Sequence, residues 1–580
     1  MDSSFTILTP NAMLGYGYRE DHFWYGVEKY NPAAIIVDSG STDGGPYKLG
    51  MNKMTCGRES YIRDLSPILE ACFYRKIKVL IGSVGGDGSD KHVEEMLEIV
   101  RGIAESNGYS FKIATIRAGM DRTLIKERIR SNRCSPCGPL DPLTVKDVDA
   151  AVDVVAQMGA EPFMQALKDD PDIILGGRSY DPAPFAAFCM SRGVDPGVAW
   201  HMGKIMECGG ICAVPKGRSM IATMRKDSFD LIPLSPLERC TPLSVASHTL
   251  GAVFSPTPVY QIKLEGVELL GYRTIFIGGI RDPILISQID DFLEKVRQYT
   301  HGLFPALDKS EKCRLNYHIY GRNAVMGPLE TEISVAYELG IMGEVMAETQ
   351  ELSHTITNNV RTSLLHMPYE GQLATTGNFA SPLSPHEQEA GAVFKFSLYH
   401  LIDLNAGEEL DLFPIRFHQI GTTSPVQEEK GHLTQSQLEF FTSTKPLPIA
   451  RKETTQDAVA MMNIAKVIRS KNSGPFELTL DIMFDDQESY ERVKKADLLT
   501  NSIIKRLYRV EDHDILTNMY FEPALAWKCT LKRPWAQGSF GERDTLGTQQ
   551  HAPLLTLLVP ASGKKALMNG KLNGKVNGTI

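Results

Sequence analysis

The sequence has 580 residues, of which 42% are hydrophobic and 23% are charged, and its formal net charge is −9. A chain of this length and composition suggests a globular protein of roughly two to four domains. The negative charge, with basic residues scattered among acidic ones, argues against nucleic acid as the main partner. No uncharged apolar run approaches the roughly 18 residues of a membrane-spanning helix, so we expect no membrane association.

The first residues and the cysteines favour a cytoplasmic location. The start, MDSSFTILTPNAM, lacks the basic residues and the long apolar core of a secretory signal. The ten cysteines are spread through the whole chain. This distribution is typical of reduced thiols rather than of a disulfide framework.

Apolar runs and helical patterns alternate over the first 210 residues. The expected strands are 5–8, 33–37, 78–84, 111–116 and 172–177. Amphipathic spacing predicts helices over 92–105 and 145–159. Near-continuous apolar strands that alternate with helices indicate an α/β fold with a doubly wound, mostly parallel sheet.

Polar, glycine-rich segments follow four of these expected strands. They are DSGSTDGGP at 38–46, GGDGSD at 85–90, RAGMDR at 117–122 and GRSYDPAP at 177–184. In an open α/β sheet, ligands bind outside the carboxyl ends of the strands. We therefore expect the four segments to share one site.

The rest of the chain divides into further regions. Strand and helix patterns, including a helix over 346–367, predict an α+β region, and a segment rich in Ser, Thr, Pro and Glu at 421–455 reads as a linker. A compact α+β domain follows, with a strand expected at 476–484. The predicted domains are 1–250, 251–455 and 456–560, followed by a disordered tail at 561–580.

Several long motifs resemble those of a known family. DSGSTDGGP, GGDGSD, GGRSYDPAPF, GKIMECGGICA and RCTPLSVASHTL are similar to the acyclic terpene utilisation family, AtuA. AKVIRSKNSGPFELTLDIMFDD, EPALAWK and GTQQHAPL resemble a small domain of unknown function that is encoded beside AtuA-type proteins or fused to them. The resemblance implies a role in the catabolism of citronellol- and geraniol-type acids and their CoA thioesters.

The segment GGDGSD does not fit the common phosphate-binding motifs. It lacks the Lys-Ser/Thr ending of a P-loop, and its glycines are too close together for a dinucleotide fingerprint. Backbone N–H groups at the start of the next helix can hold a carboxylate or phosphate, with Gly85, Gly86 and Ser89 in contact with substrate. Asp87 is a candidate general base or cation ligand, whereas Asp90 fits a helix-capping role equally well.

The segment DSGSTDGGP supplies two further carboxylates. Together with Asp87, Asp38 and Asp43 would allow one acid to stay protonated while another is ionised. Ser41 and Thr42 are candidate substrate-binding residues. Two alternatives stay open: Mg²⁺ binding, because that ion prefers carboxylates plus substrate oxygens, and ordinary turn chemistry. We assign no metal ligands.

Two arginines and one histidine complete the candidate site. Arg178 and Arg117 follow expected strands and would orient a substrate carboxylate. Asp181 precedes a proline and is expected to cap a helix. His551, in GTQQHAPL, is a candidate catalytic residue from the C-terminal domain.

The leading hypothesis is an enzyme of small-molecule metabolism. It would act on a small branched or terpenoid-type carboxylic acid, or on its acyl thioester, as a lyase, hydratase or isomerase. The expected partners are a small carboxylate or acyl-CoA and further copies of the chain. Two alternatives are a non-catalytic scaffold or ligand-binding subunit and an acyl transferase.

Overall fold

The computed structural model describes residues 4–249, 254–330, 336–373, 376–421, 431, 433–446 and 458–560. The chain forms two compact units. Unit 1 consists of residues 1–448, 472–477 and 533–546, and unit 2 of residues 449–471, 478–532 and 547–580. The expected tail at 561–580, and most of the expected linker at 421–455, lie outside the described residues. None of the helices described is long and apolar enough to span a membrane.

An eight-stranded sheet forms the first half of unit 1. Its order is β14-β4-β7-β3-β2-β1-β8-β9. The parallel strands are β1 (Phe5–Thr9), β2 (Ala34–Asp38), β3 (Lys78–Gly82), β7 (Ile173–Gly176) and β4 (Phe111–Ile116). The antiparallel strands are β8 (Met220–Met224), β9 (Phe229–Pro233) and β14 (Ile415–Ile420). All five strands expected from the apolar runs are therefore present.

Helices cover both faces of this sheet. Ile35 and Val37 of β2 face one core, and Ala34 and Ile36 of the same strand face the other. The first core contains α1 (Glu20–Tyr30), α3 (Arg58–Arg75) and α4 (Asp90–Asn107), and the second contains α7 (Glu161–Leu167), α8 (Ala183–Met190) and α9 (Pro196–Met206). The α/β class is confirmed; the strand order does not confirm a doubly wound sheet.

The helix expected over 145–159 is wrong in its second half. Helix α6 covers only Val145–Ala150, and strand β6 follows at Ala151–Gln157. The sequence VDVV combines β-branched side chains with a two-residue alternation that suits a strand. Pairing with β10 (Gln261–Ile280) stabilises the strand. This partner is more than 100 residues away in the chain, so the local sequence does not reveal it.

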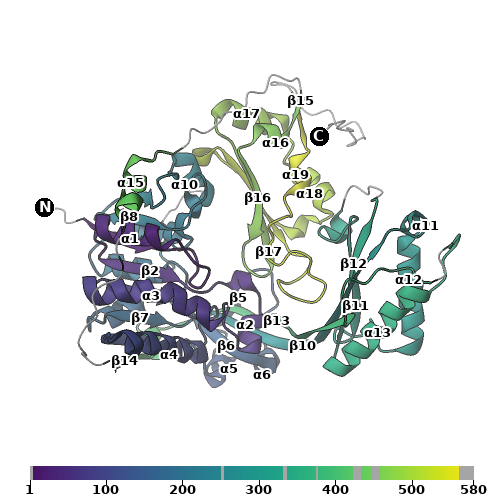
Figure 1. Ribbon diagram of the computed structural model, residues 1–580, viewed down its shortest axis with the longest axis horizontal. Helices are drawn as coiled ribbons and strands as arrows, with labels where there is room; N and C mark the ends of the chain where they lie inside the picture. The colour runs from purple at the N-terminus through teal and green to yellow at the C-terminus, as the bar shows by residue number, and fades with distance from the viewer. Residues whose placement is uncertain are drawn as a thin grey trace. The chain divides into compact units, whose positions relative to one another are not determined.

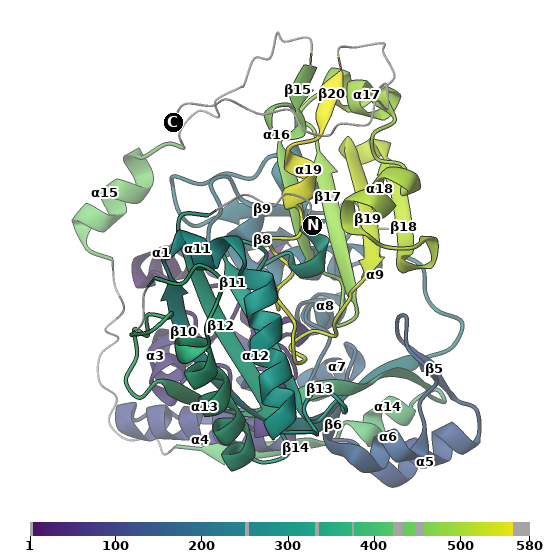
Figure 2. The same cartoon turned by 90° about the vertical axis from the view of Figure 1, so that its right-hand side faces the viewer.

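A second sheet forms the other half of unit 1. Its order is β11-β12-β10-β13-β5, and β6 also pairs with β10. The strands are β11 (Arg314–Tyr320), β12 (Leu339–Ala347), β13 (Glu387–Asp403) and β5 (Cys134–Pro136). In Figures 1 and 2, the long strands β10 and β13 extend from the β6 end of this sheet to the end that α12 (Ile289–Leu303) and α13 (Gln350–His366) cover. Helix α13 is the helix expected over 346–367, with its start delayed by the end of β12.

Unit 2 contains a four-stranded sheet of order β16-β17-β19-β18. Its elements are β16 (Val467–Asn472), β17 (Glu477–Met483), β18 (Ile515–Phe521), β19 (Ala526–Lys532), α17 (Gln487–Ala496) and α18 (Asn501–Tyr508). A two-stranded sheet joins β15 (Ala458–Ala460) to β20 (Leu558–Pro560), beside α16 (Met461–Ile464) and α19 (Ala552–Leu555). The remaining helices, all in unit 1, are α2 (Tyr47–Met51), α5 (Arg122–Arg130), α10 (Pro242–His248), α11 (Pro283–Ser287), α14 (Glu408–Leu412) and α15 (Gln435–Ser443).

Candidate functional site

The loops that follow β2, β3 and β7 meet at one edge of the eight-stranded sheet. A Cβ atom added at Gly40 would lie 2.1 Å from the carbonyl oxygen of Gly86. One added at Gly88 would lie 2.1 Å from the backbone nitrogen of Arg178. These glycines are required because the three backbones touch. The expectation that the glycine-rich segments come together is confirmed for these three loops.

Arg178 and Glu265 form a buried ion pair at the centre of this edge. Arg178 follows β7 and is 2% exposed, and Glu265 projects from β10. The guanidinium donates from Nε to Glu265 Oε2 at 2.9 Å and from Nη2 to Glu265 Oε1 at 3.1 Å. Burial alone would raise the pKa of Glu265, but the charges of Arg178 and Lys263 lower it from 4.5 to about 2. Glu265 is therefore a stable carboxylate.

The remaining donors of Arg178 are also used by the protein. Its Nη1 donates to the Ser83 hydroxyl at 3.0 Å and to the Ser179 carbonyl at 2.8 Å, and it pairs with Asp181 at 3.3 Å. Its Nη2 donates to the hydroxyl of Thr42 at 3.0 Å. Every N–H group of the guanidinium thus has a protein acceptor. This arrangement fits a residue that holds the loops together, rather than the substrate clamp expected from the sequence.

Three carboxylates lie together beside this ion pair. Ligand oxygens of Asp38, Asp181 and Glu207 are all within 4.8 Å of one another. We call these residues the carboxylate cluster. Asp38 ends β2 and is 2% exposed, and Glu207 follows α9 and is 7% exposed. Nζ of Lys204 lies 2.6 Å from Oε1 of Glu207.

The electrostatics of the carboxylate cluster favour a retained proton. Burial, followed by the charges of Asp181 and Glu207, holds the pKa of Asp38 well above its ordinary value. Burial also raises the pKa of Glu207, although Lys204 opposes the shift. Like charges at this spacing disfavour full ionisation. Asp38 is therefore the carboxyl group of the cluster best suited to hold a proton.

The same three side chains are the residues that would hold a cation, if the protein uses one. Carboxylate oxygens are the ligands that Mg²⁺ and Ca²⁺ prefer. Lys204 already neutralises part of the charge on Glu207. Both proton sharing and cation binding thus act on the same excess of negative charge.

The candidate residues in the loop after β2 have different surroundings from one another. The Thr42 hydroxyl donates to Glu265 Oε1 at 2.9 Å, which ties this loop to β10. Ser41 accepts from the backbone N–H of Asp43 at 3.0 Å, and the Asp43 side chain is exposed. Lys48, which is 3% exposed, donates to the carbonyl of Ser41 at 2.8 Å. Burial and the charge of Arg178 lower the pKa of Lys48.

The loop after β3 forms a separate Asp–His pair. Asp87 Oδ1 lies 2.6 Å from Nδ1 of the buried His92 and accepts from the backbone N–H of Ser89 at 2.8 Å. Burial lowers the pKa of His92, but the hydrogen bond and charge of Asp87 give a net rise. A Cβ atom at Gly86 would lie 2.0 Å from Thr55 Oγ1, and Gly85 has a φ of +75°. The backbone of Gly85 and Gly86 is thus packed against protein atoms.

Two predicted roles change in the structure. Asp181 belongs to the carboxylate cluster, and the helix cap expected there is wrong because Pro182 is the N-cap of α8. Asp90 accepts from the backbone N–H groups of Ala118 and Gly119, so it joins α4 to the loop after β4.

The other two candidates lie in different surroundings. Arg117 pairs with Glu94 of α4. His551 belongs to unit 2, where its backbone N–H donates to the Ser470 hydroxyl at 3.2 Å. Among the residues described, Arg117 forms no hydrogen bond or ion pair with the carboxylate cluster.

Sequence reasoning did not assign Glu207, Lys204, Glu265 or Lys48 to the site. Glu207 and Lys204 stand in the motif GKIMECGGICA, which offered a local signal. Lys48 lies ten residues after the end of β2, and no local pattern separates it from surface lysines. Glu265 sits in a strand of the second sheet, so only the tertiary structure reveals its role.

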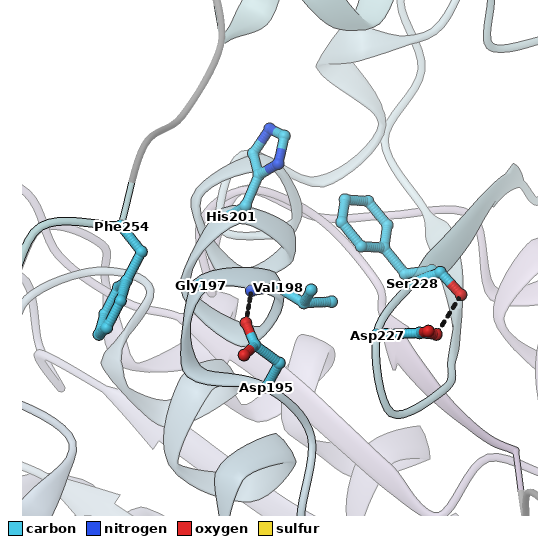
Figure 3. Close-up of a pocket in the computed structure, with 8 residues that line it drawn as sticks. Asp195, Gly197, Val198, His201, Asp227, Ser228 and Phe254 are labelled. Carbon is cyan, nitrogen blue, oxygen red and sulfur yellow. Dashed lines mark hydrogen bonds between the residues drawn. The ribbon is translucent and has the colours of Figure 1, made fainter.

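A shallow pocket opens at the other end of α9. Its volume is about 440 Å³, and it is lined by Asp195, Val198, His201, Asp227, Phe229 and Phe254 with two smaller residues. Figure 3 shows His201 rising from α9 between Phe254 and the turn that carries Asp227. The His201 ring meets Phe229 edge-on at 5.6 Å, and burial lowers the pKa of His201. The pocket lining contains none of the carboxylate cluster.

The fold and the site define a mixed α/β protein with an acidic cluster at the carboxyl ends of its parallel strands. Residues 51–216 match the family model described as acyclic terpene utilisation family protein AtuA, and residues 461–558 match a domain of unknown function, DUF4387. The chain therefore carries an AtuA-family region and a C-terminal DUF4387 domain, as the motifs predicted. No curated protein and no solved structure matches the chain.

Proposed function

We propose that this protein is an enzyme that acts on a small branched or terpenoid-type carboxylic acid, or on its acyl thioester. The reaction would be an acid–base elimination, hydration or isomerisation. The observation that carries the proposal is the carboxylate cluster, in which burial and like charges favour a shared proton on Asp38. The AtuA match supports the class of substrate.

Each member of the carboxylate cluster has a distinct role in this proposal. Asp38, with its raised pKa, donates a proton. We assign the acceptance of a proton to Asp181, whose Oδ1 lies 3.3 Å from Nη1 of Arg178. Arg178 and Glu265 hold the three loops in place and do not touch the substrate.

An elimination shows how the protons balance. The ionised carboxylate takes a proton from the carbon beside the substrate carbonyl, and the electron pair forms the new carbon–carbon double bond. The bond from the neighbouring carbon to its hydroxyl breaks, Asp38 protonates the leaving oxygen, and water departs. Hydration is the reverse, and an isomerisation returns the proton to a different carbon.

Lys204 is suited to bind the negative end of such a substrate. It lies beside Glu207, its side chain is 40% exposed, and its Nζ is 5.9 Å from the ring centre of Tyr180. Tyr180 is 41% exposed and packs against Trp200 at 5.7 Å. An exposed cation next to aromatic surface suits a carboxylate attached to a branched apolar chain.

Proton exchange with solvent tests this function without knowledge of the product. The purified full chain is incubated in D₂O with acyclic branched acids and their CoA thioesters, with Mg²⁺ or with EDTA. We expect mass spectrometry to show deuterium on a substrate carbon, or gain or loss of water. We expect Asp38→Asn to reduce the rate by roughly 100-fold or more, which is the usual contribution of a general acid.

The control is Asp170→Asn, because Asp170 precedes β7 and its side chain is 87% exposed at the other end of that strand. It should retain the wild-type rate. If Asp38→Asn exchanges as fast as wild type, the assigned proton donor is wrong. If wild type binds these compounds but never exchanges a proton, the protein is a ligand-binding subunit and the enzymatic proposal fails.

A further inference from the structure

Residues 533–546 are a distant part of the sequence that packs into unit 1. They fall within the segment that matches DUF4387, yet they form one compact body with residues 1–448. The segment is internally braced. Arg533 donates to Glu542 at 3.0 Å, with side chains only 6% and 4% exposed, and to the carbonyl of Asp544 at 2.9 Å.

One end of this segment holds the loop after β2. Gln537 is fully buried, and its Nε2 donates to the carbonyl of Asp43 at 2.6 Å and to that of Thr545 at 3.1 Å. Its backbone N–H donates to the carbonyl of Pro475 at 2.9 Å. Next to it, Gly538 has a φ of +70°, and a Cβ atom there would lie 2.5 Å from Pro46 Cδ. The segment therefore touches both the backbone of Asp43 and the end of that loop.

The other end is anchored on the second sheet. Phe540 is buried with Met346 of β12 and Val393 of β13. Arg543 donates to the carbonyl of Ala324 at 3.0 Å and to that of Tyr317 at 3.4 Å. An apolar anchor and a charged one fix the segment, so Gln537 is presented by a rigid element rather than by a free loop.

The contact at Asp43 lies one residue from the ion pair of the site. Thr42 donates to Glu265 and accepts from Arg178, and Arg178 in turn pairs with Asp181 of the carboxylate cluster. A shift of the Asp43 carbonyl moves Thr42 with it. The position of the loop is thus coupled to the charges beside Asp38.

We infer that residues 533–546 act as a clasp for the loop 41–46, and that Gln537 is a positioning residue for the carboxylate cluster. The DUF4387 segment would then complete a site that lies in the AtuA-like part of the chain. The chemical role of the carboxylate cluster in this inference rests on the proposed function. The clasp itself can be tested by measurements that need no enzymatic activity.

The test uses Gln537→Glu and Gln537→Met in the full chain. Glutamate has the same shape as glutamine, but its ionised carboxylate faces two carbonyl oxygens and donates to neither. Methionine removes the donors without adding charge. Gln298→Met is the matched control, because Gln298 lies exposed on α12 and its side chain donates to Glu294 of the same helix.

Amide hydrogen exchange measures the loop directly. The N–H of Gly45 donates to the carbonyl of Thr42 at 2.9 Å, so peptides that cover 39–46 report its opening. We expect these peptides to exchange roughly ten-fold faster in both Gln537 variants, and unchanged in the control. If Gln537→Glu does not fold, Gln537→Asn keeps the amide on a shorter side chain and should give a smaller increase. Wild-type exchange in every folded variant overturns the clasp.

The titration of Asp38 separates a positioning role from a purely structural one. Carbon-13 NMR of aspartate-labelled protein follows the Asp38 carboxyl, whose signal is the one that Asp38→Asn removes. Water entry at the loosened loop should weaken the effect of burial and bring the pKa of Asp38 down toward its ordinary value in Gln537→Met, but not in Gln298→Met. A faster loop with an unchanged Asp38 titration would show that Gln537 does not position the cluster.

Discussion

Two groups of charged side chains lie at one sheet edge and differ in how their charges are balanced. In the matched group, Arg178 and Glu265, opposite charges pair and every guanidinium N–H has an acceptor. The carboxylate cluster is the unmatched group, because its acids outnumber the cations beside them. Asp38, Asp181 and Glu207 bring three acids together, with Lys204 paired to Glu207 and Arg178 shared with Asp181. The matched group lowers the pKa of its acid, Glu265, whereas the unmatched group raises the pKa of Asp38.

The difference teaches which part of the site is scaffold and which part is available for chemistry. A buried ion pair with all its hydrogen bonds made is costly to break and offers little to a ligand. An excess of buried negative charge costs stability, and it is relieved by a proton, a cation or a substrate. Such strained groups concentrate at functional sites. The predictions below test this contrast.

The largest effect should come from the matched group. Glu265→Gln leaves Arg178 and Lys263 without their carboxylate in a buried place, which should cost about 3–5 kcal/mol in the free energy of unfolding. Urea denaturation at pH 7 measures the loss. Because the pKa of Glu265 falls from 4.5 to about 2 on folding, the contribution is complete above pH 4.5 and disappears as the pH drops toward 2.

The control for this variant is Glu311→Gln. Glu311 is 81% exposed and lies 3.9 Å from Lys395, so its removal should change stability by less than about 0.5 kcal/mol. Equal stability of Glu265→Gln and wild type would contradict the role of the matched pair as scaffold.

A substitution at Gly88 tests whether the loops depend on close backbone contact. Alanine would place a methyl group 2.1 Å from the backbone nitrogen of Arg178, at a φ of +63°. We expect a loss of about 1–3 kcal/mol, measured by thermal or urea unfolding. Gly102→Ala in α4 meets no atom within 4 Å and should be neutral or slightly stabilising. A stable Gly88→Ala protein would show that the loops can separate.

A substitution in the unmatched group should act with the opposite sign. Asp38→Asn removes a buried acid that resists ionisation, so the variant should melt at a higher temperature than wild type at pH 7–8, by roughly 2–4 °C. Below about pH 4 the carboxyl group is protonated in both folded and unfolded chains, and the difference should vanish.

The expected rise in melting temperature follows from the titration of Asp38 in the folded and unfolded chains. As the pH rises above about 4, the unfolded chain releases the Asp38 proton while the folded chain retains it, so wild type loses stability and the asparagine variant does not. A lower melting temperature for Asp38→Asn at pH 8 would mean that the carboxylate is stabilised by a partner and belongs with the matched group.

The location of the site was largely predictable from the sequence, but few of its ion pairs and hydrogen bonds were. The apolar runs identified β2, β3 and β7, and the polar segments after them identified the edge at which Asp38 and Arg178 meet. Glu265 lies 87 residues beyond Arg178 in a strand of another sheet. No local pattern indicates that pairing, so Arg178 was interpreted as a substrate clamp.

The helix expected over 145–159 and the cap expected at Asp181 failed for the same physical reason. In both places the local pattern allowed two states, and a distant partner selected one. Pairing with β10 turned 151–157 into a strand. Asp181 instead lies beside Asp38 and Glu207, which other parts of the chain supply, although Asp-Pro is a common start of a helix.

The smallest effect is expected at Arg117, the other arginine predicted to bind substrate. It pairs with Glu94, and the two side chains are 26% and 45% exposed. Solvent-exposed pairs of this kind contribute about 0.2–1 kcal/mol, and added salt weakens them. Arg117→Ala should therefore shift the urea midpoint slightly at low salt and less at 1 M NaCl, while Glu94→Gln gives the same small shift. A loss that is large and independent of salt would place Arg117 among the matched, buried charges. A normal stability with lost binding of branched acids would restore it as a substrate ligand, and the site would then extend from the carboxylate cluster to the loop after β4.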